Sequence, residues 1–233
     1  MTDTSWQLVH GKVIVDFLSF LNKETDQFIL KGDTALSVCY ELDRFSEDID
    51  LDCTKRDIKE CVRRFCSIYG YEATVTKDTN LVKRCLIDYG QKEHQLKIKV
   101  SYRQTSIDSD TVKTVNGIRV YSLDRLAQLK VGAYCNQDKL RDLYDLSYVC
   151  IKHFDELTET TKNIVRDALM YKGLDQLEYL LHTQKDPLID NEKLLNNFLL
   201  MHEKLGLLCD ENDALIQEPA SEKAVNPSNS HSR

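Results

Sequence analysis

Four carboxylates crowd the short segment RFSEDIDLD. They are Glu47, Asp48, Asp50 and Asp52. Neighbouring like charges are destabilising unless something positive lies among them. Because apolar and acidic residues alternate there, the segment predicts a strand from Ile49 to Asp52 that directs its aspartates to one face. Carboxylates that converge in this way are the oxygen ligands that Mg²⁺ or Mn²⁺ prefers, so a divalent metal site is the first hypothesis.

A glycine turn lies upstream of these carboxylates. Phe28 to Lys31 predicts a short strand, Gly32 a tight turn, and Thr34 the N-cap of a helix. The start of that helix would offer backbone N–H groups to phosphates. Together, the turn and the aspartates of the strand suit two-metal phosphoryl or nucleotidyl transfer. Either feature alone is more often an ordinary turn or a solvated strand end.

Two segments carry a resemblance to a known family. KGDTALSVCYELDRFSEDIDLD resembles the signature of the AbiEii/AbiGii toxin family, nucleotidyltransferases of abortive-infection and toxin–antitoxin systems. That signature runs Gly-Gly-Thr-Ala-Leu and then Arg-x-Ser-x-Asp-hydrophobic-Asp. The segment VNGIRVYSLDRLAQLKVGAYCNQDKLRDLYDL is similar to the later family motif, in which a helical lysine precedes Arg-Asp-Leu-Tyr-Asp-Leu.

The resemblance implies an α+β fold: a polymerase-β-like nucleotidyltransferase mixed sheet with flanking helices, followed by a helical C-terminal part. It implies a Mg²⁺-dependent enzyme that moves a nucleoside monophosphate from an NTP to a hydroxyl of RNA, tRNA or a protein, and a cognate antitoxin as partner. Asp48 and Asp50 would ligate the metal and would be catalytic with Lys130 and Asp142. The residues expected to bind the nucleotide are Gly32, Asp33, Thr34, Arg44, Ser46, Lys97, Lys139 and Arg141.

Several of these residues have a second interpretation. Lys130 lies among apolar residues in LAQLKVGAY, so it either points at a negative group or extends along the surface to solvent. Asp142 and Asp145 are three residues apart on a predicted helix and share a face, where they can cap the helix start instead of serving chemistry.

Three positions depart from the family pattern. Asp33 places negative charge where a triphosphate would approach, Lys99 stands where a third carboxylate is often found, and Gln137 replaces an arginine. These departures support a second hypothesis, a degenerate non-catalytic member that binds a nucleotide, a nucleic acid or a protein. A glycosyltransferase with a metal-binding Asp-x-Asp is disfavoured because the chain has no Rossmann-like first half.

The periodicity of apolar residues predicts the elements that must position these groups. Residues 1–122 are expected to form the α+β domain, 123–217 a helical domain that completes the site, and 218–233 a disordered tail. An Asn-Gly pair at Asn116 predicts a hairpin. The predicted helices are Trp6–Leu21, Thr34–Tyr40, Arg56–Tyr69, Leu123–Tyr134, Arg141–Lys152, Asp155–Leu169, Leu174–His182 and Asn191–Leu208, and the further strands Tyr71–Val75, Leu81–Tyr89, His94–Tyr102, Thr111–Val115 and Ile118–Tyr121.

Composition narrows the class of protein. The chain has 233 residues, a net charge of −7 and eight cysteines with no zinc-ligand spacing, which indicates reduced thiols. No apolar run is long enough to span a membrane and no signal peptide is recognisable, so a cytoplasmic location is expected. Residues 53–103 carry an excess of six positive charges. That region is either a phosphate-binding surface or a set of solvated basic faces.

Overall fold

The computed structural model describes residues 5–91 and 93–208, and the expected tail at 218–233 lies outside them. Its centre is a mixed sheet of seven strands in the order β3-β4-β5-β2-β1-β7-β6. The strands are β1 (Ile29–Lys31), β2 (Asp48–Asp52), β3 (Glu72–Asp78), β4 (Val82–Asp88), β5 (Leu96–Ser101), β6 (Val112–Val115) and β7 (Ile118–Tyr121).

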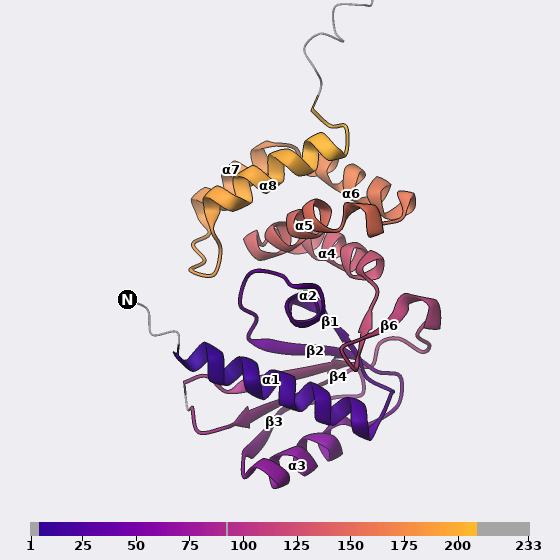
Figure 1. Cartoon of the computed structure of the whole chain (residues 1–233), viewed down its shortest axis with the longest axis vertical. Coiled ribbons are helices and arrows are strands. Elements are labelled where there is room, and N and C mark those ends of the chain that lie inside the picture. Colours follow the sequence, from indigo (N-terminus) through magenta and orange to yellow (C-terminus); the bar gives the residue numbers. More distant parts are fainter. Residues whose placement is uncertain (1–4, 92, 209–233) are drawn as a thin grey trace, which may run out of the picture.

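Helices pack on this sheet and continue beyond it. Figure 1 shows α2 between the sheet and the C-terminal helices, with α3 at the opposite end of the molecule. The helices are α1 (Ser5–Glu24), α2 (Gly32–Tyr40), α3 (Ile58–Tyr69), α4 (Leu123–Gln137), α5 (Leu140–Lys152), α6 (Glu159–Lys172), α7 (Asp175–Thr183) and α8 (Asn191–Lys204). In the described part of the chain no helix has both the length and the apolar character that a membrane span needs. The predicted fold class, a mixed sheet with flanking helices and a helical C-terminal part, is confirmed.

Strand register brings the chemistry-bearing residues together. β2 pairs antiparallel with β1 and parallel with β5. Asp48 lies opposite Lys97, and Asp50 lies between Lys99 on one side and Lys31 on the other. The apolar residues that alternate with these on β2 and β5 are almost fully buried, so the alternation predicted for β2 is confirmed and its polar face is left for a site.

Two predicted helix starts were wrong. Thr34 is not an N-cap, because α2 begins at Gly32 and Thr34 bonds elsewhere through its hydroxyl. The helix predicted from Arg56 begins at Ile58, since the Asp57 side chain caps it by accepting a hydrogen bond of 3.0 Å from the backbone N–H of Lys59.

The predicted helix from Asp155 is divided in two. A 3-10 turn at Phe154–Glu156 precedes α6, and Thr158 caps α6 by accepting a hydrogen bond from the backbone N–H of Thr161. A hydroxyl cap of this kind marks a new helix start.

Candidate active site

A cleft of about 510 Å³ opens between the polar face of the sheet and helices α4 and α5. Of the residues predicted for the site, all except Thr34 and Arg44 line this cleft. Those that line it are Gly32, Asp33, Ser46, Asp48, Asp50, Lys97, Lys130, Lys139, Arg141 and Asp142. The two segments that carry the family resemblance therefore form one concave surface.

The β2 carboxylates have positive partners from β5. Lys97 forms an ion pair with Asp48, and the Nζ atom of Lys99 lies 3.2 Å from an oxygen of Asp50. The Asp48 and Asp50 side chains keep 39% and 33% of their surface exposed, so both remain reachable from the cleft. Lysines thus supply the positive charge that this crowded segment requires.

The last aspartate of β2 has a different environment. Asp52 is buried, accepts hydrogen bonds of 2.5 Å from Lys31 and 3.0 Å from the Tyr121 hydroxyl, and does not line the cleft. Its charge is satisfied inside the fold, so its role is structural.

The turn between β1 and α2 brings backbone close to Asp50. Gly32 has φ of +75°, a conformation that favours glycine, and a Cβ atom there would lie 3.5 Å from Asp50. The Thr34 hydroxyl bonds to the Ser46 hydroxyl at 2.7 Å and donates to the carbonyl oxygen of Asp48. Thr34 therefore fixes the start of β2 against the first turn of α2, without entering the cleft.

The Lys130 side chain is buried and points at carboxylates, not at solvent. Its side chain is 7% exposed and forms ion pairs with Asp33, with Asp142 at 3.2 Å and with Asp145 at 2.5 Å. Burial alone would lower the pKa of Lys130, but the three carboxylates outweigh it and raise that pKa. The lysine is therefore charged, and Asp142 and Asp145 both turn toward it instead of capping α5.

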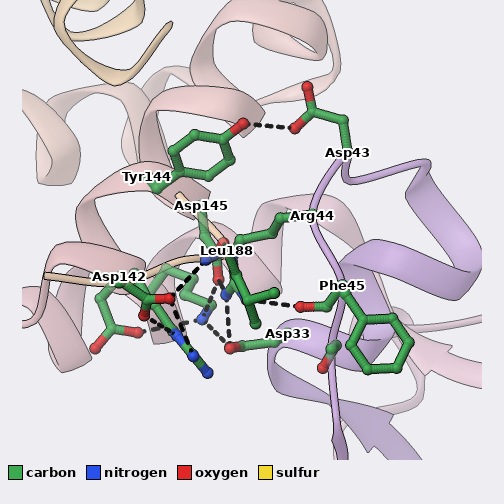
Figure 2. Close-up of polar contacts among 12 residues, drawn as sticks. Asp33, Asp43, Arg44, Phe45, Asp142, Tyr144, Asp145 and Leu188 are labelled. Carbon is green, nitrogen blue, oxygen red and sulfur yellow. Dashed lines mark hydrogen bonds and ion pairs between the residues drawn. The ribbon is translucent and has the colours of Figure 1, made fainter. Parts of the chain in front are cut away.

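Arg44 lies behind the cleft wall, where it was not expected. Its guanidinium donates two hydrogen bonds, of 2.6 and 2.7 Å, to the carboxylate of Asp145 and one of 2.6 Å to Asp33, as Figure 2 shows. Burial alone would lower the pKa of Arg44, but the carboxylates of Asp145 and Asp33 outweigh burial and raise that pKa. The Arg44 guanidinium therefore joins Asp145 of α5 to Asp33 of α2 and fixes the wall of the cleft.

The same contacts explain how the fold accommodates Asp33, which departs from the family pattern. Burial would raise the pKa of this carboxyl, yet Lys130 and Arg44 outweigh burial and hold the pKa well below its usual range. Asp33 is thus a paired anion whose charge two cations offset.

The start of α5 contributes two cations to the rim, Lys139 at the N-cap position and Arg141 in the first turn. Lys139 is exposed and has no carboxylate partner among the residues that the structure describes, whereas Arg141 is paired with Asp186. Gln137, the third departure, also lines the cleft and contributes an uncharged amide there. Lys139 is the rim cation with a side chain available to an incoming anion.

Four residues that were not predicted for the site also carry charge into the cleft. They are Lys31, Glu47, Arg84 and Lys99. The Nε atom of Arg84 is buried and has no hydrogen-bond partner among the described residues. Lys31 and Glu47 had a local signal, because they adjoin Gly32 and Asp48 in sequence, and the family resemblance had marked Lys99 as the place of a third carboxylate. Arg84 reaches the cleft through strand pairing, which no local pattern reveals.

The basic region at residues 53–103 does not form one surface. Arg84, Lys97 and Lys99 line the cleft, whereas Lys83 pairs with Asp57 at the start of α3. Successive residues of a strand point to opposite faces, so this region distributes its charge over both sides of the sheet.

Two groups of carboxylates lie near the cleft. Asp33, Asp142 and Asp145 have oxygens within 4.8 Å of one another, but Lys130 and Arg44 already pair with them and offset two of their three charges. Asp48 and Asp50 present accessible hard oxygen donors at the cleft, with lysine partners that have flexible stems. The β2 pair therefore presents the more accessible oxygens, whereas those of Asp33, Asp142 and Asp145 are already bonded to cations.

Comparison with known proteins gives a consistent result. The family model described as nucleotidyl transferase AbiEii toxin, type IV toxin–antitoxin system, matches residues 17–208. The crystal structure of JHP933 from Helicobacter pylori superposes with a TM-score of 0.71 at 26% identity, over 86% of this chain and 94% of that one. A second H. pylori crystal structure, provisionally named a nucleotidyltransferase, gives 0.69 at 26% identity over 88% and 98%. A search of curated proteins finds no match. The chain therefore belongs to the AbiEii family of nucleotidyl transferase toxins of type IV toxin–antitoxin systems.

Proposed function

We propose that this chain is a divalent-metal-dependent nucleotidyltransferase that moves a nucleoside monophosphate from an NTP to a hydroxyl of an RNA, such as a tRNA, or of a protein. One observation carries the proposal: Asp48 and Asp50 face the same cleft as the Gly32 turn and the cations of α4 and α5. This combination places anion-binding and metal-binding groups around a space large enough for a nucleotide.

The metal-binding part of the proposal falls to the β2 aspartates. Asp48 and Asp50 would hold Mg²⁺ or Mn²⁺, and the ion would displace Lys97 from Asp48. When bound, the ion polarises the α-phosphoryl group and offsets the charge of the departing pyrophosphate.

The phosphate-binding part falls to the turn and the rim. The first turn of α2, which starts at Gly32 beside Asp50, would offer backbone N–H groups and the positive end of a helix dipole to a phosphate. Lys139 would bind phosphate oxygens directly, and Arg141 and Lys97 would do so by exchanging their present carboxylate partners.

Lys130 and Asp142 would act at the wall of the cleft. Lys130 would hold the Asp33 end of the turn in place and present positive charge to the triphosphate, with Asp142 fixing its direction. Thr34, Ser46 and Arg44 would keep the turn and β2 in register behind the reacting groups.

The partners follow from the family and from the charges. An NTP and a cognate antitoxin are the partners that a toxin of this family implies. An RNA acceptor is supported by the cations Arg84, Lys97 and Lys99 on the β4–β5 side of the cleft. We place this activity in the cytoplasm, where NTPs and RNA are available.

One observation favours a second candidate function, a non-catalytic protein that binds a nucleotide, a nucleic acid or a partner protein. Both candidate metal ligands are already paired with lysines, and Lys99 occupies the place of a third carboxylate. A site of this kind can bind phosphates without releasing pyrophosphate.

Incubation with α-³²P-labelled NTPs, Mg²⁺, total RNA and total cell protein tests the two candidates. We expect label on RNA with wild type and none with the double variant Asp48→Ala, Asp50→Ala. The double variant Asp88→Ala, Asp110→Ala is the control, because it removes the same charge from residues that do not line the cleft. No transfer of any nucleotide to RNA or protein, with NTP binding retained, would support the non-catalytic function instead.

A further inference from the structure

A row of cations crosses the floor of the cleft through Asp50. In the strand register, Arg84 of β4 lies opposite Lys99 of β5, Lys99 opposite Asp50 of β2, and Asp50 opposite Lys31 of β1. All four line the cleft. Within the cleft, one carboxylate therefore shares its row with three positive side chains, of which Lys31 is already neutralised by Asp52.

The neighbouring row is less positive. Asp48 lies opposite Lys97, and the next residue outward on β4 is Leu86, which carries no charge. Lys97 is therefore the one cation that the register places in this row. On this count a divalent ion meets less repulsion beside Asp48 than beside Asp50, because fewer positive side chains share its row.

Of the other carboxylates that line the cleft, Asp33 and Asp142 already have cationic partners, and Glu47 immediately precedes β2. Lys130 contacts both Asp33 and Asp142, and Arg44 also holds Asp33. Two divalent ions 3.5–4 Å apart need several carboxylates to offset a total charge of about +4. With Lys99 3.2 Å from Asp50, the floor has one ammonium where a further carboxylate would be required.

We propose that this cleft holds a single divalent ion, with Asp48 as its principal ligand, and that the Lys99 ammonium takes the place of a second ion. This inference rests on the proposed metal-dependent function. Lys97 gives up Asp48 to the ion and turns toward phosphate, whereas Lys99 stays beside Asp50. Both lysine side chains are about one-third or more exposed, at 35% and 40%, so the exchange at Lys97 needs no rearrangement of the core.

Mn²⁺ binding tests the number of ions directly. Isothermal titration counts the ions bound per chain, with Mn²⁺ alone and with each of the four α,β-methylene NTP analogues. Electron paramagnetic resonance distinguishes an isolated Mn²⁺ from two coupled ions. We expect one ion per chain in wild type, an uncoupled spectrum, and at least tenfold weaker binding in Asp48→Ala.

Two matched variants separate charge from ligation at position 99. Lys99→Gln removes the ammonium without adding a ligand, so it should tighten binding of the single ion but leave the spectrum uncoupled. Lys99→Glu adds a carboxylate and should bind a second ion with a coupled spectrum. Thermal melting checks that each variant is folded, and Lys99→Asp replaces Lys99→Glu if the latter is not.

The outcomes distinguish this inference from the function on which it rests. Two ions per wild-type chain with a coupled spectrum would overturn the single-ion proposal and leave the metal-dependent function intact. Binding that is the same in Asp48→Ala would overturn the assignment of Asp48 as the principal ligand, whereas binding of no ion would overturn both this proposal and the metal-dependent function.

Discussion

Asp145 carries a carboxylate that is buried behind the wall of the cleft. Its side chain is fully buried, and its two oxygens accept hydrogen bonds from Arg44 while Lys130 lies 2.5 Å away. Removal of one member of a buried ionic network leaves the remaining charges without compensation. The Asp145 carboxylate therefore stabilises the fold mainly by compensating the buried charges of Arg44 and Lys130.

We predict that Asp145→Ala lowers the free energy of unfolding by about 3 kcal/mol or more, because Arg44 and Lys130 lose their shared partner inside the fold. Urea denaturation followed by circular dichroism measures this change. Asp142→Ala is the matched control: it lies on the same helix and contacts Lys130 at 3.2 Å, but has no bond to Arg44. A loss below about 1 kcal/mol for Asp145→Ala would contradict the argument.

At the scale of elements, the β1–α2 turn depends on two small features. Gly32 supplies a positive φ, and Thr34 connects α2 to β2 through its hydroxyl. The turn therefore fixes the position of the α2 N-terminus relative to Asp50.

Gly32→Ala should destabilise the protein by about 1–2 kcal/mol, because the left-handed conformation is unfavourable for a residue with a Cβ atom. The added methyl group would be in ordinary contact with Asp50 at 3.5 Å, so the cost comes from the backbone. Thermal or urea unfolding measures it. Gly206→Ala is a suitable control, since that glycine also has a positive φ but lies outside the cleft. Equal loss of NTP binding in both variants would contradict a role of the turn in the site.

Thr34→Val keeps the shape of the side chain and removes its hydroxyl. We expect a loss of about 1–3 kcal/mol, because the Asp48 carbonyl oxygen and the Ser46 hydroxyl lose a buried partner. Thr34→Ser retains the hydroxyl and should recover most of this stability. If Val and Ser behave alike in urea denaturation, the hydroxyl bridge does not position β2.

Most elements were predictable from the sequence because their signals are local. The alternation in β2, the Asn-Gly hairpin and the helical periodicity of α4 and α5 each depend on a few neighbouring residues. The partners of the site were not predictable in this way. Lys99 meets Asp50 because β5 pairs parallel with β2, and Arg44 meets Asp145 across 101 residues. The family resemblance named ten of the residues that line the cleft, but not their ion pairs.

At the scale of the whole molecule, acidic residues join the sheet region to the C-terminal helices. Asp43, in the loop between α2 and β2, accepts a hydrogen bond of 2.9 Å from Tyr144 and forms an ion pair with Lys193 of α8. Figure 2 shows the first of these contacts. Asp186 pairs with Arg141 and so attaches the segment before α8 to the rim of the cleft.

These contacts predict how stability depends on pH. Burial would raise the pKa of Asp43 and of Asp186, but hydrogen bonds from Lys193 and Arg141 outweigh it, and both pKa values lie below the ordinary 3.8. A carboxyl whose pKa is lower in the folded state binds fewer protons there, so its stabilising contribution is complete well above pH 3.8 and is lost as pH falls through the folded-state value. The free energy of unfolding should therefore decrease as the pH is lowered below about 4.

The double variant Asp43→Asn, Asp186→Asn tests this origin of the pH dependence. At pH 7 it should be less stable than wild type in urea denaturation, because two ion pairs are lost. As the pH falls below about 4, wild type loses the same charges, so the difference between the two proteins should shrink toward zero. Asp88→Asn, Asp110→Asn, at positions with no salt bridge in the described residues, is the control and should follow wild type at every pH. A difference that stays constant down to the lowest pH at which both proteins fold would show that packing, and not charge, joins the two regions.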